Sequence, residues 1–424
     1  MTCCYHKEIV DMRHELHRFP EEGWTEFWTT AYIAKYLRGL GIEVLMGEKV
    51  ISRENCLGRN SQLVAAGIEA AKAKGVCECL LEEMQELTGC VAVLDTGRPG
   101  PTVALRFDID CVNVLESTDP AHLPAKEGWR SERDGLMHAC GHDAHAATGM
   151  AICHWAKEHL DQLNGKLKVV FQPAEEGVRG ASAVAASGVL DDCDYFLTSH
   201  VSLMAKSGEV LSSPINFLST TKYDVTFTGR PAHAGIEPNA GRNALAAACH
   251  AVTQLLGISR HGSGMTRVNI GRLIAGEGRN VIPPKAVLVL ETRGITSALD
   301  EYMFGEVKRI AKAAADMWGC GYSIDIKGGT KSGESDLEVA EVVAEEARAM
   351  GCFDNVIVEQ NFGASEDYSH FMSTVQANGG KGTYVQVGSN LSAGHHNGHF
   401  DFDEKAMEDS LVLMARCVYR TLAK

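Results

Sequence analysis

Apolar, β-rich segments alternate with helical segments along the first half of this 424-residue chain. The expected helices lie at 7–19, 25–40, 144–163 and 181–188, and the expected strands at 89–97, 101–110, 166–173 and 194–200. Such alternation is typical of an α/β fold with a largely parallel sheet. Functional side chains in these folds collect beyond the carboxyl ends of the strands. We therefore expect polar residues at strand ends to converge.

The order of elements changes over residues 219–327 to strand, helix, strand, strand, helix, strand. This βαββαβ order indicates a compact inserted α+β domain. At 45.8 kDa the chain is large enough for two cores. We expect an α/β domain at 1–217 and 328–424, interrupted by an inserted domain at 218–327. Residues 45–87 contain one helical segment and form an excursion of unknown role.

Charge and cysteine usage argue against several classes of function. The chain has 55 acidic and 40 basic residues, a net charge of -15 and no basic run, so nucleic acid is not an expected partner. No stretch approaches the ~20 apolar residues of a membrane helix, and the N-terminus lacks the apolar core of a signal peptide. The 14 cysteines follow no regular framework, which favours reduced thiols over disulfides. These features predict a cytoplasmic protein.

The segment MHACGHDAH, at 137–145, is the densest cluster of metal-binding residue types. Cys140 and His142 lie two residues apart, and a thiolate with an imidazole suits zinc and also accepts manganese or cobalt. Alone, a Cys-x-His pair is weak evidence, because both residue types are also buried for packing. Its meaning therefore depends on what other segments contribute.

Three other segments add candidate ligands. Glu175 and Glu176, in FQPAEEG, follow an apolar strand, where one carboxylate can bind metal while the other takes a proton from water. A solvated pair of loop acids is the alternative. His200 ends the strand DYFLTSH, and the Gly-rich loop SAGHHNGHF offers His395, His396 and His399.

Together, Cys140, His142, Glu176, His200 and one C-terminal histidine make five protein ligands. Five are too many for one tetrahedral ion that keeps an open position. Two ions that share a bridging ligand would use them all, and paired ions are a common route to hydrolysis. The residues therefore predict a two-metal hydrolase.

Through MHACGHDAH and FQPAEEG the chain resembles the di-metal aminoacylase and carboxypeptidase-G-like amidohydrolases, in the Cys-containing branch that includes auxin-conjugate hydrolases. LHRFPEEGWTEF, GEGRNVIP and LVLETRG extend the resemblance over nearly the whole chain. It implies a peptidase-like catalytic domain with an inserted dimerisation or lid domain, and a homodimer. It also implies two divalent metal ions per chain, manganese or zinc, with cobalt also accepted. A related second subunit stays open.

The resemblance also implies roles for single residues. Glu175 is the expected general base and acid, and Asp110, in RFDID, is expected to orient a ligand imidazole. The expected metal ligands are Cys140 as the bridging thiolate, His142, Glu176, His200 and His396.

The inserted domain carries further expected site residues. His233, in GRPAHAG, matches a histidine that reaches the active site of a neighbouring subunit, where it holds the developing oxyanion. Asn280 and Arg293, expected on adjacent strands, resemble the pair that binds the free α-carboxylate of the substrate. A strand-end salt bridge is the alternative for Arg293. Arg279 is either a cation for a glutamate side chain or a solvated loop charge.

The function implied is hydrolysis of the amide bond in an N-acyl or N-aroyl amino acid. The resemblance favours p-aminobenzoyl-glutamate, while indole-3-acetyl-aspartate and simple N-acyl amino acids remain open. An alternative of another class is a non-catalytic partner subunit in a hydrolase complex. The complete set of candidate ligands argues against it, because a degenerate subunit should have lost at least one.

Overall fold

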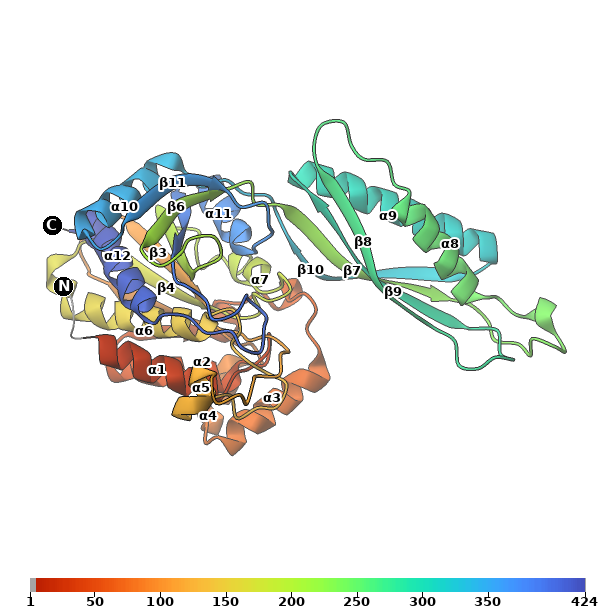
Figure 1. Ribbon diagram of the computed structural model, residues 1–424, viewed down its shortest axis with the longest axis horizontal. Coiled ribbons are helices and arrows are strands. Elements are labelled where there is room, and N and C mark those ends of the chain that lie inside the picture. The colour runs from red at the N-terminus through yellow and green to blue at the C-terminus, as the bar shows by residue number, and fades with distance from the viewer. Residues whose placement is uncertain (1–4, 424) are drawn as a thin grey trace. The chain divides into compact units, whose positions relative to one another are not determined.

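A computed structural model describes residues 5–423, and the chain divides into two compact units (Figure 1). Unit 1 runs to Ile215 and resumes over Glu334–Phe362 and from Asp367, and unit 2 comprises Asn216–Gly333 and Gly363–Glu366. The second unit is thus inserted into the first. The domain boundaries predicted at 217/218 and 327/328 stay predictions.

Unit 1 is built on an eight-stranded sheet with the order β1-β2-β4-β3-β5-β12-β6-β11. The central strands β4, β3, β5 and β12 run parallel, while β1, β2 and β6 are antiparallel to a neighbour. This arrangement confirms the predicted α/β class. The strands span Glu43–Met46 (β1), Cys90–Asp95 (β2), Thr102–Asp108 (β3), Lys166–Gln172 (β4), Tyr195–Val201 (β5), Glu209–Ile215 (β6), Asn355–Asn361 (β11) and Lys381–Val387 (β12).

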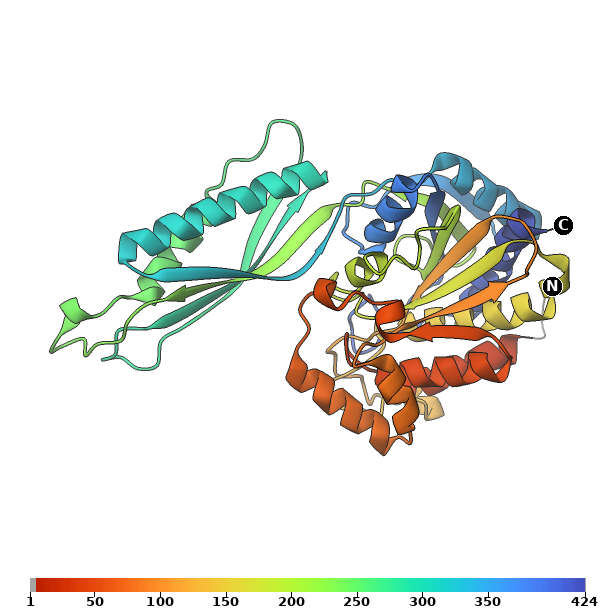
Figure 2. The ribbon, with the colours of Figure 1, turned by 180° about the vertical axis from the view of Figure 1, so that it is seen from behind.

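Helices cover both faces of this sheet (Figures 1 and 2). On one face α6 lies against β3 and β4, with α1, α2 and α12 packed beside it, and on the other α7 and α11 pack together. No helix within residues 5–423 combines the length and apolar composition needed to cross a bilayer. The helices span His6–Arg18 (α1), Phe27–Gly39 (α2), His142–Glu158 (α6), Ala181–Ala185 (α7), Leu337–Met350 (α10), Tyr368–Ala377 (α11) and Lys405–Leu422 (α12).

Unit 2 has the predicted βαββαβ order, and its four strands form an antiparallel sheet in the order β10-β7-β9-β8. The two helices pack on one face, where Tyr223, Val225, Leu288 and Leu290 belong to the core. The elements span Ser219–Thr228 (β7), Ala244–Leu256 (α8), Thr266–Ala275 (β8), Lys285–Gly294 (β9), Ser297–Trp318 (α9) and Gly321–Thr330 (β10).

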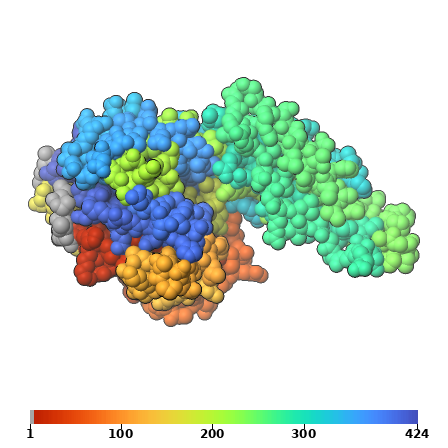
Figure 3. Space-filling model, in the orientation of Figure 1, coloured from red at the N-terminus to blue at the C-terminus, as the bar shows by residue number. Residues whose placement is uncertain are grey.

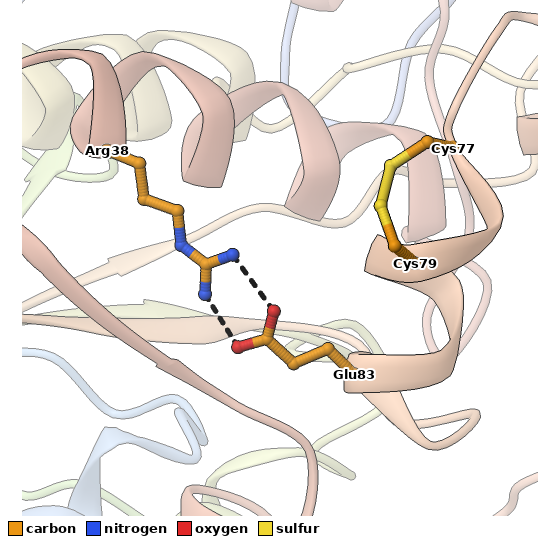
Figure 4. Close-up of a disulfide and its surroundings, with 4 residues drawn as sticks. All are labelled: Arg38, Cys77, Cys79 and Glu83. Carbon is orange, nitrogen blue, oxygen red and sulfur yellow. Dashed lines mark hydrogen bonds and ion pairs between the residues drawn. A yellow bond between two sulfur atoms is a disulfide. The ribbon is translucent and has the colours of Figure 1, made fainter.

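The excursion at 45–87 corrects two expectations. It contains the predicted helix, α3 (Ser61–Ala73), and also a second helix, α4 (Glu78–Met84). The side chain of Arg38, in α2, donates two hydrogen bonds to Glu83 of α4 (Figure 4). Cys77 and Cys79 form a disulfide, so the prediction of reduced thiols was wrong for this pair. The start of α4 brings their Cα atoms to 5.4 Å, which the spacing alone did not reveal. The ten other cysteines among the described residues are free.

Candidate metal and catalytic site

The candidate residues of unit 1 meet at the carboxyl edge of its parallel strands. Cys140 and His142 lie where the loop after β3 enters α6. Asp110 follows β3, Glu175 and Glu176 follow β4, His200 lies near the end of β5, and His396 lies in the loop after β12. Segments that are far apart in the sequence thus converge, as the alternating pattern predicted.

The five predicted metal ligands lie close together. Cys140, His142 and Glu176 each place one potential ligand atom within 4.8 Å of the other two. Cys140 Sγ also lies 3.7 Å from His200 Nε2, and His396 Nε2 lies 3.1 Å from Glu176 Oε1. The cluster contains the thiolate, imidazole and carboxylate donors that divalent metal ions bind in proteins.

Cys140 is buried in an environment that favours its thiolate. Burial by itself raises the pKa of a thiol. Here the positive charge of His142, together with hydrogen bonds from His200 and His395, lowers the pKa of Cys140 well below its ordinary value. Because the thiolate is the form of cysteine that binds metal, this environment fits a ligand.

His142 has one ring nitrogen fixed and one available. Its Nδ1 lies 2.9 Å from the backbone oxygen of Asp110 and 3.3 Å from Asp110 Oδ1, which orients the ring. Its Nε2 is buried and has no hydrogen-bond partner among residues 5–423. A buried nitrogen without a partner is costly unless it binds something else, so His142 also fits a metal ligand.

Asp110 joins this imidazole to the two glutamates. Its Oδ1 accepts a hydrogen bond from the backbone N–H of Glu175 at 3.1 Å, and its Oδ2 accepts one from Glu176 at 3.0 Å. Asp110 is fully buried. One carboxylate therefore holds His142 and the Glu175–Glu176 turn in a fixed relation.

Glu26 supports the same turn and was not predicted. Ala174, just before the turn, has a φ of 52°, a strained value for a residue other than glycine. Its N–H donates to Glu26 Oε1 at 2.7 Å, while Thr88 Oγ1 donates to Glu26 Oε2 at 2.6 Å. Burial, together with the charge of Asp110, raises the pKa of Glu26 to about 8. The sequence signal was weak, because a glutamate before a helix is common.

Asp108 and His145 were also missed, although both lie inside quoted motifs. His145 Nδ1 lies 2.6 Å from Asp108 Oδ1, and its Nε2 accepts the N–H of Val201 at 2.9 Å. These residues and His142 and His200 form a second group with metal-binding atoms. Since both nitrogens of His145 are already hydrogen-bonded, it positions β5 and His200 and is not available as a ligand.

The C-terminal loop places two histidines beside Cys140. The backbone N–H of His396 donates to the oxygen of Ala139 at 2.8 Å, and hydrogen bonds to Cys140 and Glu176 raise the pKa of His396 to about 10. His395 Nδ1 lies 3.4 Å from Cys140 Sγ, and its Nε2 donates to the oxygen of Ser202 at 2.7 Å. His396 thus contacts both Cys140 and Glu176, and His395 contacts Cys140 and the backbone of Ser202.

This loop lies beside the segment that links β3 to α6 (Figure 3). The N–H of Ser117 donates to the oxygen of Gly398 at 2.8 Å, and His399 lies against His122 with ring centroids 5.9 Å apart. His399, the third candidate histidine, therefore packs at the surface away from Cys140.

Charged residues behind α6 hold its first turn. Asp143, next to His142, accepts a hydrogen bond from His17 Nδ1 at 2.8 Å and lies 3.4 Å from Arg13 Nε. Arg13 Nη2 also lies 2.7 Å from Asp401 Oδ1, in the segment after the C-terminal loop. All four side chains are buried. They tie α1, α6 and the C-terminal segment together directly behind the ligands.

The site residues predicted in unit 2 are His233, Asn280 and Arg293. His233 forms an isolated bridge with Val281, and the N–H of Ala234 donates to the oxygen of Asn280 at 2.9 Å. Asn280 lies in the turn between β8 and β9, so its predicted place on a strand was wrong. Arg293 lies on β9 and pairs with Glu291, with Nε and Oε1 2.9 Å apart. The salt bridge considered for Arg293 is therefore present, although the side chain is partly exposed.

Several known proteins resemble this chain in sequence or structure. The pattern of Peptidase family M20/M25/M40 matches residues 104–423. The chain is 48% identical to a Haemophilus influenzae protein named as the homolog of a p-aminobenzoyl-glutamate hydrolase subunit, over 98% of this chain and 99% of the relative. It is 40% identical to the indole-3-acetyl-aspartic acid hydrolase of Enterobacter agglomerans, over 96% of this chain and 94% of that relative.

A solved structure has the same architecture. It is the aminobenzoyl-glutamate utilization protein from Klebsiella pneumoniae, which matches with a TM-score of 0.84 and 34% identity, over 98% of this chain and 96% of that one. The resemblance to di-metal amidohydrolases that the motifs carried is thereby confirmed. The chain belongs to Peptidase family M20/M25/M40.

Proposed function

We propose that this chain is a metal-dependent amidohydrolase that releases glutamate from p-aminobenzoyl-glutamate. The observation that carries the proposal is the buried carboxylate of Asp110, which holds Glu175, Glu176 and His142 together. The Haemophilus relative is named for p-aminobenzoyl-glutamate and the Enterobacter relative for indole-3-acetyl-aspartic acid. Both names describe an acidic amino acid in amide linkage, which supports this class of substrate.

The proposed ligand set fits two divalent metal ions. The thiolate of Cys140 would be one of the ligands that hold them, and manganese, zinc and cobalt are all compatible with the donors. When bound, such ions lower the pKa of water and polarise an amide carbonyl. The other proposed ligands are His142, Glu176, His200 and His396.

Glu175 is the proposed general base and acid. Its carboxylate takes a proton from the attacking water and then gives that proton to the nitrogen of the leaving amino acid. The hydrogen bond from its backbone N–H to Asp110 holds the backbone of Glu175 in place, and with it the base of the side chain. Glu176, the next residue, is the proposed metal ligand of the pair.

Unit 2 supplies the remaining proposed roles, which rest on the family resemblance. His233 stabilises the negative charge that develops on the carbonyl oxygen, from a neighbouring copy of the chain. Asn280 and Arg293 bind the free α-carboxylate of the leaving amino acid. In this proposal Glu291 gives up its contact with Arg293 when substrate binds.

A homodimer through unit 2 is part of the proposal. Strand β8 lies at an edge of its sheet, and its Leu273 and Ile274 are exposed. An exposed edge strand readily pairs with another strand. A related second subunit stays open, because the Haemophilus relative is named as the homolog of one subunit of a hydrolase. Ten free thiols among the described residues support a cytoplasmic location, in spite of the Cys77–Cys79 disulfide.

The test is release of glutamate from p-aminobenzoyl-glutamate by the purified chain with added Mn²⁺. We expect Glu175→Gln to lower kcat by about 10²–10⁴-fold, because it cannot transfer the proton, while the metal content stays the same. Indole-3-acetyl-aspartate and N-acetyl amino acids are assayed in parallel. Full turnover by Glu175→Gln would remove the proposed mechanism. Little bound metal would favour the non-catalytic subunit, and bound metal without hydrolysis of any of these compounds would indicate a missing second subunit.

A further inference from the structure

Two arginines lie directly opposite each other on the helix-free face of the sheet in unit 2. Leu288 and Leu290 of β9 point into the core under the helices. Successive side chains of a strand point to opposite faces, and Arg293 is an odd number of residues from both leucines, so it lies on the opposite face. The antiparallel register pairs Arg293 with Arg267 of β8. Residues paired in this way point to the same face, with Cβ atoms about 5 Å apart.

Only one of these two arginines has a carboxylate partner within residues 5–423. Arg293 has a partner in Glu291, with Nε and Oε1 2.9 Å apart. Arg267 is exposed, donates only to the backbone oxygen of Thr266, and forms no ion pair with any residue in 5–423. Lys222 of β7, paired with Glu291, adds another cation on this face. Like charges directly opposite each other cost stability unless an anion lies between them.

We propose that Arg267 is a specificity-determining residue that binds the side-chain carboxylate of an acidic leaving amino acid. The inference rests on the proposed function, in which Arg293 binds the α-carboxylate. Glutamate and aspartate carry their two carboxylates on a short aliphatic chain, which suits two guanidinium groups on neighbouring strands. Each guanidinium binds a carboxylate with two parallel hydrogen bonds. A neutral amino acid would leave Arg267 without a partner.

The register separates Arg267 from the other candidate cation, Arg279. Arg279 lies in the exposed turn between β8 and β9, next to Asn280, and has no strand partner that aligns it with Arg293. Arg267 is fixed by the ladder of hydrogen bonds between β8 and β9. Arg279 is therefore the matched control for removal of a positive charge.

The experiment compares p-aminobenzoyl-glutamate with p-aminobenzoyl-glutamine, its neutral isostere, using the full chain with Mn²⁺. We expect the wild type to prefer the glutamate compound in kcat/KM by about 10- to 100-fold, as a charge-assisted pair allows. Arg267→Gln should reduce this ratio to near one, mainly by raising KM for the glutamate compound. Arg267→Lys should keep part of the preference, and Arg279→Gln should keep all of it.

The outcomes separate this inference from the function on which it rests. An Arg267→Gln variant that keeps the wild-type ratio, or that loses activity on both compounds equally, overturns the role of Arg267. A wild type that hydrolyses both compounds at the same rate overturns it as well. If the wild type hydrolyses neither compound nor any other N-acyl amino acid, the proposed function itself fails.

Discussion

His17 is a buried histidine held between two carboxylates behind the metal site. Its Nδ1 lies 2.8 Å from Asp143 Oδ2, and its Nε2 lies 3.0 Å from Glu116 Oε1. Burial lowers the pKa of such a group, but the hydrogen bonds to Asp143 and Glu116 raise the pKa of His17 to about 9. The imidazole is therefore charged at neutral pH. It links the loop after β3 to the first turn of α6.

This charge makes the stability of unit 1 depend on pH. The folded pKa of about 9 lies above the ordinary value of 6.5, so the contribution is complete below pH 6.5 and is lost as pH rises through about 9. The difference corresponds to about 3 kcal/mol in the free energy of unfolding. We expect the wild type to lose about this much more stability than His17→Gln between pH 6.5 and about 10, measured by urea unfolding. Parallel pH profiles would contradict a charged His17.

The sequence predicted those site residues that stand in recognisable local patterns, such as Cys140, His142 and the two glutamates. It did not predict Glu26, because its contact with Ala174 joins residues 148 positions apart. Its importance depends on the left-handed backbone at Ala174, which no local pattern reveals. His145 was missed for a different reason. Its hydrogen-bond partners, and not its residue type, decide that it positions a strand and does not bind metal.

At the scale of elements, α6 approaches the sheet closely because Gly149 has no side chain. An added Cβ would lie 2.6 Å from Phe107 Cδ2, in a fully buried contact. We expect Gly149→Ala to lower the free energy of unfolding by about 1–3 kcal/mol through overpacking. This loss outweighs the roughly 1 kcal/mol by which alanine favours a helix. Because α6 begins at His142, metal affinity should fall as well.

Gly305, in α9, is the matched control. No atom beyond the adjacent backbone of its own helix lies within 4 Å of a Cβ added there. Gly305→Ala should therefore raise the free energy of unfolding by about 0.5–1 kcal/mol. Urea unfolding of both variants measures the contrast. Equal stabilisation by the two substitutions would show that α6 can move away from β3 at little cost.

Long elements with a clear periodic pattern were the easiest to predict from the sequence. The strands and helices of unit 2 are long, and in β9 buried and exposed residues alternate over ten positions. Two of the missed elements, β1 with four residues and α4 with seven, are too short for a periodic pattern. The Cys77–Cys79 disulfide follows from where α4 begins, so it was missed together with that helix.

At the scale of the whole molecule, metal should stabilise the catalytic unit, because its proposed ligands come from four separate segments. Binding at 100 times the dissociation constant adds about 2.7 kcal/mol. In a chain of this size we expect a chelator to lower Tm by roughly 5 °C, and added Mn²⁺ to restore it. Differential scanning fluorimetry measures the shift.

Two variants of the same loop provide the control for this shift. His396→Gln should abolish most of the response to chelator, because it removes a proposed ligand. His399→Gln, at an exposed residue that packs against His122, should keep the response. A wild-type Tm that is unaffected by chelator and by added metal would contradict a metal site in unit 1.

The position of β12 affects how the chain folds during its synthesis. This strand pairs with β5 on one side and β6 on the other, yet it follows the whole of unit 2 in the sequence. As the chain leaves the ribosome, the sheet of unit 1 exists in two pieces until residue 387 has emerged. During that time β5 and β6 each expose an edge of unpaired backbone groups to which a foreign strand can bind. A translational pause before β12 would therefore prolong the state of this protein that is most prone to aggregation.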